Sequence, residues 1–402
     1  MENPSESRLR VAIRIRPTNV QTGADAPTPP HIACTSTSVT VVAMNTHYAQ
    51  QQQAITLGDE RDRVFAFGPG HSNDSVASGL DIPAIVHDCV RGKRDGLVCC
   101  YGQSCSGKSY TMFGPKGMVQ QGLQAALALA AGCGSASGRI RIQVSASELY
   151  MNTLRPLMDS RHGQWMPVTK AEDITTVHEM VATARTVSST SLNAESSRSH
   201  AFVIVRFERG TDAGELGGGG SVSTRPPRTT GTTLVFVDLA GSERVSKSQA
   251  AGIRLQEGIE INKSLSALGN VMRALAGASQ TTPPGASPTT IPWRASKLTQ
   301  LLKAYVRCGS TIWFVLCISG EEEHAHESLS TLRFGSAVLG VTLHAHRTGE
   351  AEDGGKRAAA RTAVSSPAIG TKGTKGIEDN VSVRHWVLIY LCWACLMIVL
   401  GC

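Results

Sequence analysis

Residues 97–109 read LVCCYGQSCSGKS, and this stretch decides the fold. Its first five residues are apolar or aromatic and predict a short buried strand. The loop that follows, GQSCSGKS, fits the pattern Gly-x-x-x-x-Gly-Lys-Ser, in which the glycines let successive backbone N–H groups surround a phosphate. YTM, at 110–112, then begins a predicted helix. This strand–loop–helix context predicts an α/β domain that binds a phosphorylated nucleotide.

The two residues after the second glycine carry the chemistry of this loop. Lys108 is expected to reach the β- and γ-phosphates, and the Ser109 hydroxyl is expected to bind Mg²⁺, so the cofactors implied are ATP and Mg²⁺. A guanine nucleotide is disfavoured, because the only Asn-Lys pair, at 262–263, does not continue as the Asn-Lys-x-Asp that reads guanine. The predicted nucleotide-binding residues here are Gly102, Gln103, Ser104, Cys105, Ser106, Gly107, Lys108, Ser109 and Tyr110.

Composition bounds the class of protein. A chain of 402 residues with 41% hydrophobic and 18% charged residues suits one large α/β domain with insertions and excludes global disorder. The formal net charge of +7 favours an acidic partner, but aromatics are scarce and do not alternate with basic residues, so nucleic-acid binding is not expected. The eleven cysteines lack zinc spacing and suit reduced thiols in the cytoplasm, and the polar start MENPSESRLR is no secretory signal.

Further apolar or alternating runs predict strands at 9–16, 139–150, 200–208, 233–241 and 310–319. Helical stretches lie between them, which predicts a central mixed sheet flanked by helices on both faces. One predicted helix, 258–276, has an apolar face at spacings of 3 and 4, made by Ile261, Leu265, Leu268, Met272 and Leu275. The heptad pattern does not extend beyond these positions, 261–275. This is too short for a coiled coil, so coiled-coil dimerisation is not expected.

Polar segments interrupt this pattern. Residues 21–63, 209–231 and 277–290 are rich in Pro, Gly, Ser or Thr and are expected to be surface insertions, the first with one hairpin around 37–44. Residues 341–385 are expected to be a disordered linker, which leaves 1–340 as the main domain.

A second phosphate-sensing segment is expected at TLVFVDLAG, residues 233–241. Asp238 ends an apolar strand, where a carboxylate beside the phosphate loop suits a water-mediated Mg²⁺ contact; the alternative is a simple strand-end cap. The N–H of Gly241 is suited to report a γ-phosphate. The run NAESSRSH, at 193–200, would by itself be read as a solvated serine-rich loop.

Six motifs, taken in order, resemble the kinesin motor domain. They are YGQSCSGKSYTM, NAESSRSH, DLAGSER, GIEINKSLSALGNVMRAL, IPWRASKLTQLLK and ESLSTLRFG, and the resemblance covers roughly residues 8–340. It implies a P-loop NTPase of kinesin type, a microtubule-stimulated ATPase of the cytoplasm and microtubule cytoskeleton. It also implies that binding and hydrolysis of ATP change the position of the helix at 258–276.

By resemblance, 193–200 is switch I and 238–243 is switch II. Ser197 would join Ser109 and Asp238 at Mg²⁺, and Ser196 would touch the phosphate. Arg198 and Glu243 would form the ion pair that closes the site, with Gly241 completing the catalytic set. Arg14, Arg16 and Pro17 would pack the adenine and ribose edge.

The resemblance also implies a microtubule-binding surface. Its candidate residues are Lys247, Arg254, Lys263, Arg294, Lys297 and Arg307, each of which could equally be a solvated basic side chain. Three departures stand out: Cys105 replaces a loop glycine, Ala295 replaces an aspartate, and 335–350 does not resemble a neck linker. The last favours an alternative function, a nucleotide-regulated microtubule tether that does not step.

The segment 386–402, WVLIYLCWACLMIVLGC, is uncharged and is preceded by lysines and arginines. It is close to the length that spans a bilayer core, so a tail anchor in a membrane is expected. The alternatives are a buried terminal helix, or a chain end that is not native to the main domain.

Overall fold

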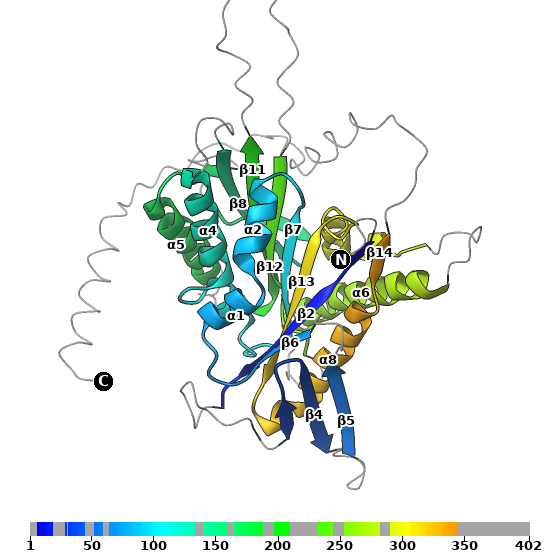
Figure 1. Cartoon of the computed structure of the whole chain (residues 1–402). Coiled ribbons are helices and arrows are strands. Elements are labelled where there is room, and N and C mark those ends of the chain that lie inside the picture. Colours follow the sequence, from blue (N-terminus) through cyan, green and yellow to red (C-terminus); the bar gives the residue numbers. More distant parts are fainter. Residues whose placement is uncertain are drawn as a thin grey trace, which may run out of the picture. The chain divides into compact units, whose positions relative to one another are not determined.

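Strand β7 (Gly96–Tyr101) lies inside a nine-stranded sheet of the described residues and ends at the phosphate-binding loop, as the sequence predicts. The computed structural model describes residues 6–18, 29, 31–44, 52–58, 64–132, 140–158, 165–187, 197–209, 231–243, 253–281 and 290–344. Figure 1 shows β7 between β12 and β13, with helices in front of the sheet and behind it.

The sheet order is β10-β8-β11-β12-β7-β13-β2-β6, and β9 pairs with β8 outside this path. The bounds are β2 (Arg10–Arg16), β6 (Val64–Phe67), β8 (Ile140–Tyr150), β9 (Thr153–Pro156), β10 (Met166–Pro167), β11 (Ser199–Arg209), β12 (Gly231–Asp238) and β13 (Thr311–Ser319). The strands from β12 to β6 are mutually parallel, whereas β11 is antiparallel to both its neighbours. The predicted mixed sheet is confirmed.

Alternate residues of β7 face two different helical layers. Leu97 and Cys99 lie in the core cluster shared with α6 (Ile253–Thr281), α7 (Lys297–Leu302) and α8 (Ala325–Leu339). Val98 and Cys100 lie in the cluster shared with α1 (Asn73–Gly79), α2 (Ile82–Val90), α3 (Lys108–Phe113), α4 (Met118–Gly132) and α5 (Ala171–Val187). Because both faces are covered, β7 and β13 are mostly apolar along their length.

Residues 32–58 contain a small sheet rather than only a surface insertion. Its antiparallel strands are β3 (Ile32–Cys34), β4 (Ser38–Met44) and β5 (Gln52–Gly58). Ile32, Val39, Val41 and Leu57 are buried in the same core cluster as α8. The expected hairpin is present, but the insertion predicted over 21–63 is partly wrong, because polar neighbours concealed the apolar alternation of these strands.

The main body also extends past residue 340. Strand β14 (Thr342–His344) pairs antiparallel with β1 (Glu6–Arg8), with Leu343 opposite Ser7. Val341 and Leu343 are buried, so the predicted linker boundary at 341 is wrong by a few residues. The run VTL was too short for its alternation to be recognised.

Helix α6 is longer than the 258–276 that its apolar face predicted. Ile261, Leu265, Leu268 and Met272 are buried, which confirms the face, and Leu275 packs against them half-buried. The helix continues to Thr281, so the insertion expected from 277 begins later. The extension reads GASQT, and the first helix-breaking prolines stand only at 283 and 284.

Chain contacts divide the protein into Met1–Ala345 and His346–Cys402, and every described residue belongs to the first unit. No helix within the described ranges is long and apolar enough to cross a membrane. The hydrophobic segment 386–402, the linker beyond 344 and the insertion residues 210–230 lie outside the described residues.

Candidate functional site

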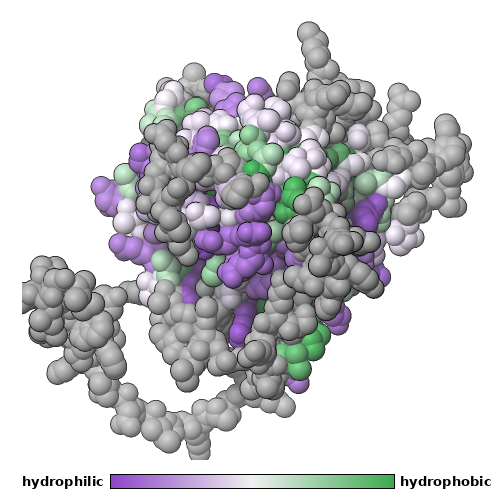
Figure 2. All heavy atoms as spheres, turned by 90° about the horizontal axis from the view of Figure 1, so that it is seen from below, coloured by the Kyte–Doolittle hydropathy of each residue, from purple (hydrophilic) through white to green (hydrophobic). Residues whose placement is uncertain are grey.

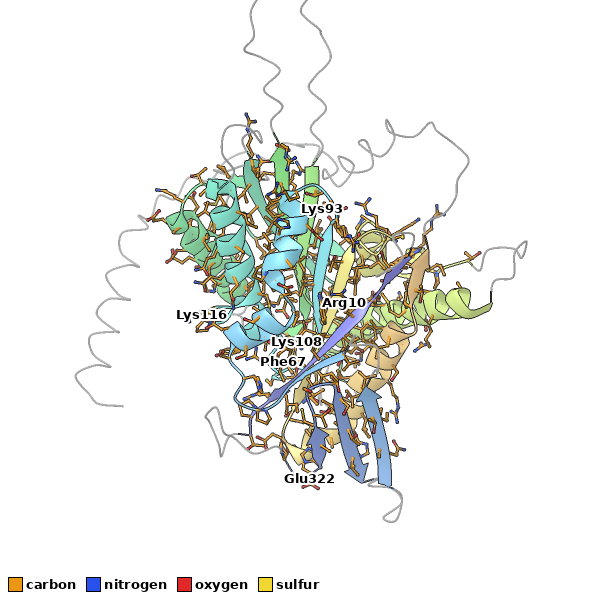
Figure 3. All side chains as sticks on the ribbon, in the orientation of Figure 1. Arg10, Phe67, Lys93, Lys108, Lys116 and Glu322 are labelled. Carbon is orange, nitrogen blue, oxygen red and sulfur yellow. The ribbon has the colours of Figure 1, made fainter. Side chains whose placement is uncertain are left out.

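The phosphate-binding loop, residues 102–107, connects β7 to α3. Gly102 has φ +151°, and a Cβ there would lie 2.1 Å from the Cys317 carbonyl oxygen, so only glycine fits. Gly107 caps α3 with φ +98°, in the left-handed region. In Figure 3, Lys108 lies at the lower end of the central strands, whereas Lys93 lies at the other end, before β7 begins. The loop therefore stands at the carboxyl edge of the parallel strands.

Cys105 adopts a backbone conformation that usually belongs to glycine. Its φ is +60°, and its side chain is exposed. An L-residue in this region costs roughly 1–2 kcal/mol. The Arg16 guanidinium donates to the Cys105 carbonyl oxygen and holds the tip of the loop. Cys105 therefore keeps a backbone conformation that strains a residue with a side chain.

Lys108 is buried, and its Nζ donates to the Gln103 carbonyl oxygen over 2.6 Å. The Ser106 hydroxyl donates to the same carbonyl over 2.8 Å. These bonds place the ammonium charge at the inner side of the loop, where this motif binds phosphate oxygens.

Asp238 and Ser109, two of the three predicted metal ligands, lie side by side. Ser109 Oγ donates to Asp238 Oδ2 over 2.6 Å. Arg185, at the end of α5, donates its Nη1 to the same oxygen over 2.7 Å. Asp238 Oδ1 is buried and has no hydrogen-bond partner among the described residues. The carboxylate thus has one oxygen that remains suited to a cation or its water shell.

Backbone hydrogen bonds join the predicted switch segments to each other and to the loop. The Gly241 N–H donates to the Ser197 carbonyl oxygen over 3.0 Å, and the Ser242 N–H donates to that of Gly102 over 3.1 Å. The third predicted metal ligand, Ser197, is therefore adjacent to Gly241. The predicted switch segments and the loop are therefore neighbours in space, and their roles in nucleotide binding stay a prediction.

The expected ion pair between Arg198 and Glu243 is not formed, because each side chain has another partner. Arg198 Nη1 lies 2.6 Å from Glu257 Oε2 of α6. Glu257 Oε1 accepts from the Tyr150 hydroxyl over 2.5 Å. Glu243 instead accepts from the N–H of Ser104 over 2.7 Å and from its hydroxyl over 2.5 Å. The predicted pair is absent because Glu257 of α6 competes for Arg198, and the N–H and hydroxyl of Ser104 compete for Glu243.

Arg14 is used inside the protein and not at an open nucleotide edge. It is buried, and its Nη1 donates to Asn73 Oδ1 over 2.5 Å and to Thr111 Oγ1 over 2.8 Å. Its guanidinium also lies 5.1 Å from the centre of the Tyr110 ring. Arg14 therefore ties β2 to α1 and α3. Tyr110 is exposed, so its predicted contact with nucleotide remains sterically open.

His200 connects the second switch segment to α6. Its Nδ1 accepts from the Ala240 N–H over 3.0 Å, and its Nε2 lies 2.9 Å from the Ser264 hydroxyl. Burial lowers the pKa of His200 to about 4, so the ring is neutral at physiological pH. With Nδ1 as the acceptor, Nε2 carries the proton and donates to Ser264.

The predicted microtubule-binding residues differ in their surroundings. Lys263 on α6, Arg294 on the 3₁₀ turn Trp293–Ala295 and Lys297 on α7 are exposed. Arg307 is bound to the buried carboxylate of Asp95, which also accepts from the Thr233 N–H over 2.7 Å. Its guanidinium thus has a structural partner. Figure 2 shows that hydrophilic side chains cover much of one face of the molecule, with only separate hydrophobic areas.

Ser196 and Lys247 lie outside the described residues, and the Arg254 side chain is not described. Four site residues were missed by the sequence reading: Arg185, Tyr150, Glu257 and the linking His200. Arg185 is a single arginine in VATARTV, and Glu257 is one of several charges on its helix, so neither carried a signal. His200 stood inside the NAESSRSH motif, and that motif was the available clue.

Comparison with known proteins gives a family match. Residues 14–341 match the family described as Kinesin motor domain. The chain is 33% identical over 321 residues to the kinesin-like protein KIN-14P of Arabidopsis thaliana, covering 72% of this chain and 29% of that protein. It is 31% identical over 349 residues to the kinesin heavy chain of Botryotinia fuckeliana, covering 80% and 36%. The chain therefore spans about a third of the length of these relatives.

Solved structures agree with the sequence match. A structure described as a fast kinesin has a TM-score of 0.65 and 25% identity, and the alignment covers 86% of this chain and 96% of that one. A KIF14 dimer, solved with AMP-PNP in complex with a microtubule, has a TM-score of 0.65 at 23% identity, with 85% and 96% covered. The second likeness concerns the fold alone.

Proposed function

Because this chain belongs to the kinesin motor domain family, a family of P-loop ATPases, we propose that it binds ATP with Mg²⁺ and hydrolyses it in a reaction stimulated by microtubules. The observation that carries the proposal is the meeting of Ser109 with Asp238, 2.6 Å apart, at the inner edge of the phosphate loop. The motif at 102–109 and the acid at the end of β12 are far apart in sequence, and phosphoryl transfer needs both at one place.

Magnesium fits the residues at this edge. Ser109 and Asp238 would hold the ion, with Ser197 as the third group, and the buried Asp238 Oδ1 is the oxygen that has no partner in the described part of the chain. When bound, the ion supplies positive charge against the phosphate oxygens. With the ion bound, Arg185 would either keep its bond to Asp238 beside the ion or release Asp238 to the ion.

The remaining residues position the substrate. The loop N–H groups and Lys108 bind the phosphates, and Gly241 presents its N–H beside Ser197. Arg198 and Glu243 would pair once they leave Glu257 and Ser104, and that pair would close the site around the attacking water. Catalysis of this kind is positioning and charge stabilisation, and no covalent intermediate is required.

Coupling to a microtubule would run through α6. His200 joins Ala240 of the nucleotide side to Ser264 of α6 through two hydrogen bonds. The exposed Lys263, Arg294 and Lys297 stand on α6 and on two elements that pack against it, and their charge suits an acidic protein surface. A change at Gly241 would thus be transmitted to the helix that carries part of this surface.

The second candidate is a microtubule tether that binds and releases with nucleotide but does not step. It is favoured by residues 335–350, which do not resemble a neck linker. The hydrophobic segment 386–402 would link such a tether to a membrane.

One experiment tests the main proposal: the steady-state ATPase rate of the full chain with and without microtubules. We expect Mg²⁺-dependent turnover that rises with microtubule concentration. Turnover without stimulation would reject the microtubule coupling, and no turnover would reject the ATPase. A gliding assay on surface-bound protein separates the motor from the tether, because the tether would hold microtubules without moving them.

A further inference from the structure

We infer that Glu257 and Tyr150 are positioning residues for ATP cleavage, which hold the Arg198 guanidinium against α6 and away from Glu243 until α6 moves. The inference rests on the proposed function and concerns the regulation of the same site. It assigns to two residues outside the nucleotide-binding segments the control of when the site closes.

Glu257 is a buried carboxylate with both oxygens engaged. Its Oε2 accepts from Arg198 Nη1 over 2.6 Å, and its Oε1 accepts from the Tyr150 hydroxyl over 2.5 Å. Two bonds on opposite oxygens fix the orientation of the carboxylate. The Glu257 side chain is only 10% exposed and that of Arg198 25%, so separating the pair leaves a largely buried carboxylate without its cation.

Tyr150 is itself held from two sides. It ends β8, where it stands opposite Ser199 of β11, the residue after Arg198. The Arg155 guanidinium lies 4.4 Å from the centre of its ring. The hydroxyl therefore approaches Glu257 from the end of β8, and the end of β8, the residue before β11 and α6 meet at this one carboxylate.

Arg198 is paired with Glu257 and not with Glu243. In this structure Glu243 is bound by the Ser104 N–H and hydroxyl, and Arg198 is bound by Glu257. To close the site, Arg198 must leave Glu257, Glu243 must leave Ser104, and the two must then pair with each other. The strength of the Arg198–Glu257 pair therefore contributes to the free-energy difference between the present arrangement and the closed one.

The release would come from α6. Glu257 lies between Leu255 and Ile259, whose side chains are 40% and 50% exposed, although both are large and apolar. The Asn152 side chain donates to Glu260 over 3.2 Å, so the turn after β8 also touches this part of α6. A microtubule that contacts these exposed residues would act directly on the turn that carries Glu257.

The test is Glu257→Gln in the full chain. Glutamine keeps the length of the side chain and can still bond Tyr150, but it removes the negative charge that holds Arg198. We expect the single-turnover rate of ATP cleavage without microtubules to rise on the order of fivefold. This is the low end of the range by which one site in a protein usually affects another. The Kd for ATP should stay unchanged, and the stimulation by microtubules should fall by the same factor.

Glu260→Gln is the matched control. It neutralises a carboxylate three residues further along α6, which faces Lys263 over 3.6 Å and Asn152 but not Arg198. It should leave the cleavage rate unchanged. Tyr150→Phe is a second variant, used if Glu257→Gln lowers Tm. It should also raise the rate of ATP cleavage, but by less than Glu257→Gln does.

The double variant Glu257→Gln with Glu243→Gln shows whether Arg198 acts through Glu243. If it does, the rise in cleavage rate disappears in the double variant. Variants at Glu257 and Tyr150 that fold as the wild type does and cleave ATP no faster would overturn the inference. A wild-type chain that cleaves no ATP would overturn the proposed function, and the inference with it.

Discussion

Arg185 and Asp238 form an ion pair of 2.7 Å between Nη1 and Oδ2, with side chains only 8% and 1% exposed. The pair joins the end of α5 to the end of β12, beside Ser109 at the start of α3. It gives the carboxylate a cationic partner from the protein itself, on the oxygen that also accepts from Ser109.

Arg185→Met should lower the free energy of unfolding by roughly 3 kcal/mol, because it leaves a buried carboxylate without its cation. The measurement is urea unfolding at pH 7 without nucleotide. Arg141→Met, at an exposed position of β8, is the control and should change stability by less than about 0.5 kcal/mol. Equal losses in the two variants would contradict the importance of the pair.

Cys105→Gly should be more stable than Cys105→Ala by about 1 kcal/mol. Both remove the thiol, but only glycine relieves the left-handed backbone at φ +60°. Thermal unfolding of the two variants side by side checks this. If alanine is as stable as glycine, the loop does not strain its residue at 105.

Acid should destabilise the protein through His200. Its folded pKa of about 4 lies below the unfolded value of 6.5, so the unfolded state binds the proton more readily. The stability contribution is complete above pH 6.5 and is lost as pH falls toward 4, with a maximum loss of roughly 3 kcal/mol. Urea unfolding at intervals between pH 7 and 4.5 measures it.

His200→Asn is the comparison for this titration. It removes the ionisable ring, so its stability should depend less steeply on pH over the same range, although it is less stable at pH 7. Parallel pH curves for the two proteins would show that another group is responsible.

Lys297→Ala and Arg307→Ala should separate a surface role from a structural one. Lys297 is exposed on α7, so its loss should weaken microtubule co-sedimentation severalfold with little change in Tm. Arg307 is bound to the buried Asp95, so its loss should lower Tm by several degrees. The reverse pattern would show that the two residues have been assigned to the wrong roles.

The sequence predicted those parts of the site whose residue types carry their own chemistry. Gly102, Lys108 and Ser109 follow from the loop pattern, and Asp238 from its place at the end of an apolar strand. The structure adds the partners that depend on three-dimensional proximity. Nothing in the sequence around Arg185 or Glu257 indicates that one meets Asp238 and the other meets Arg198.

The same reason explains the errors in the fold. Long apolar runs such as 310–319 predicted their strands correctly, because their burial on both faces leaves a clear pattern. The short strands β3 and β14 have three residues each, too few to show a period. Their pairing partners, and not their own residues, decide that they are strands.

The pairing of β1 with β14 has a mechanical consequence. Glu6 stands opposite His344, so the chain enters this ladder and leaves it at the same end. A load applied between the residues before Glu6 and those after His344 would therefore peel the two strands apart one hydrogen bond at a time. A ladder loaded in this way opens at low force, so tension on these ends would detach β14 before it disturbed the nucleotide site.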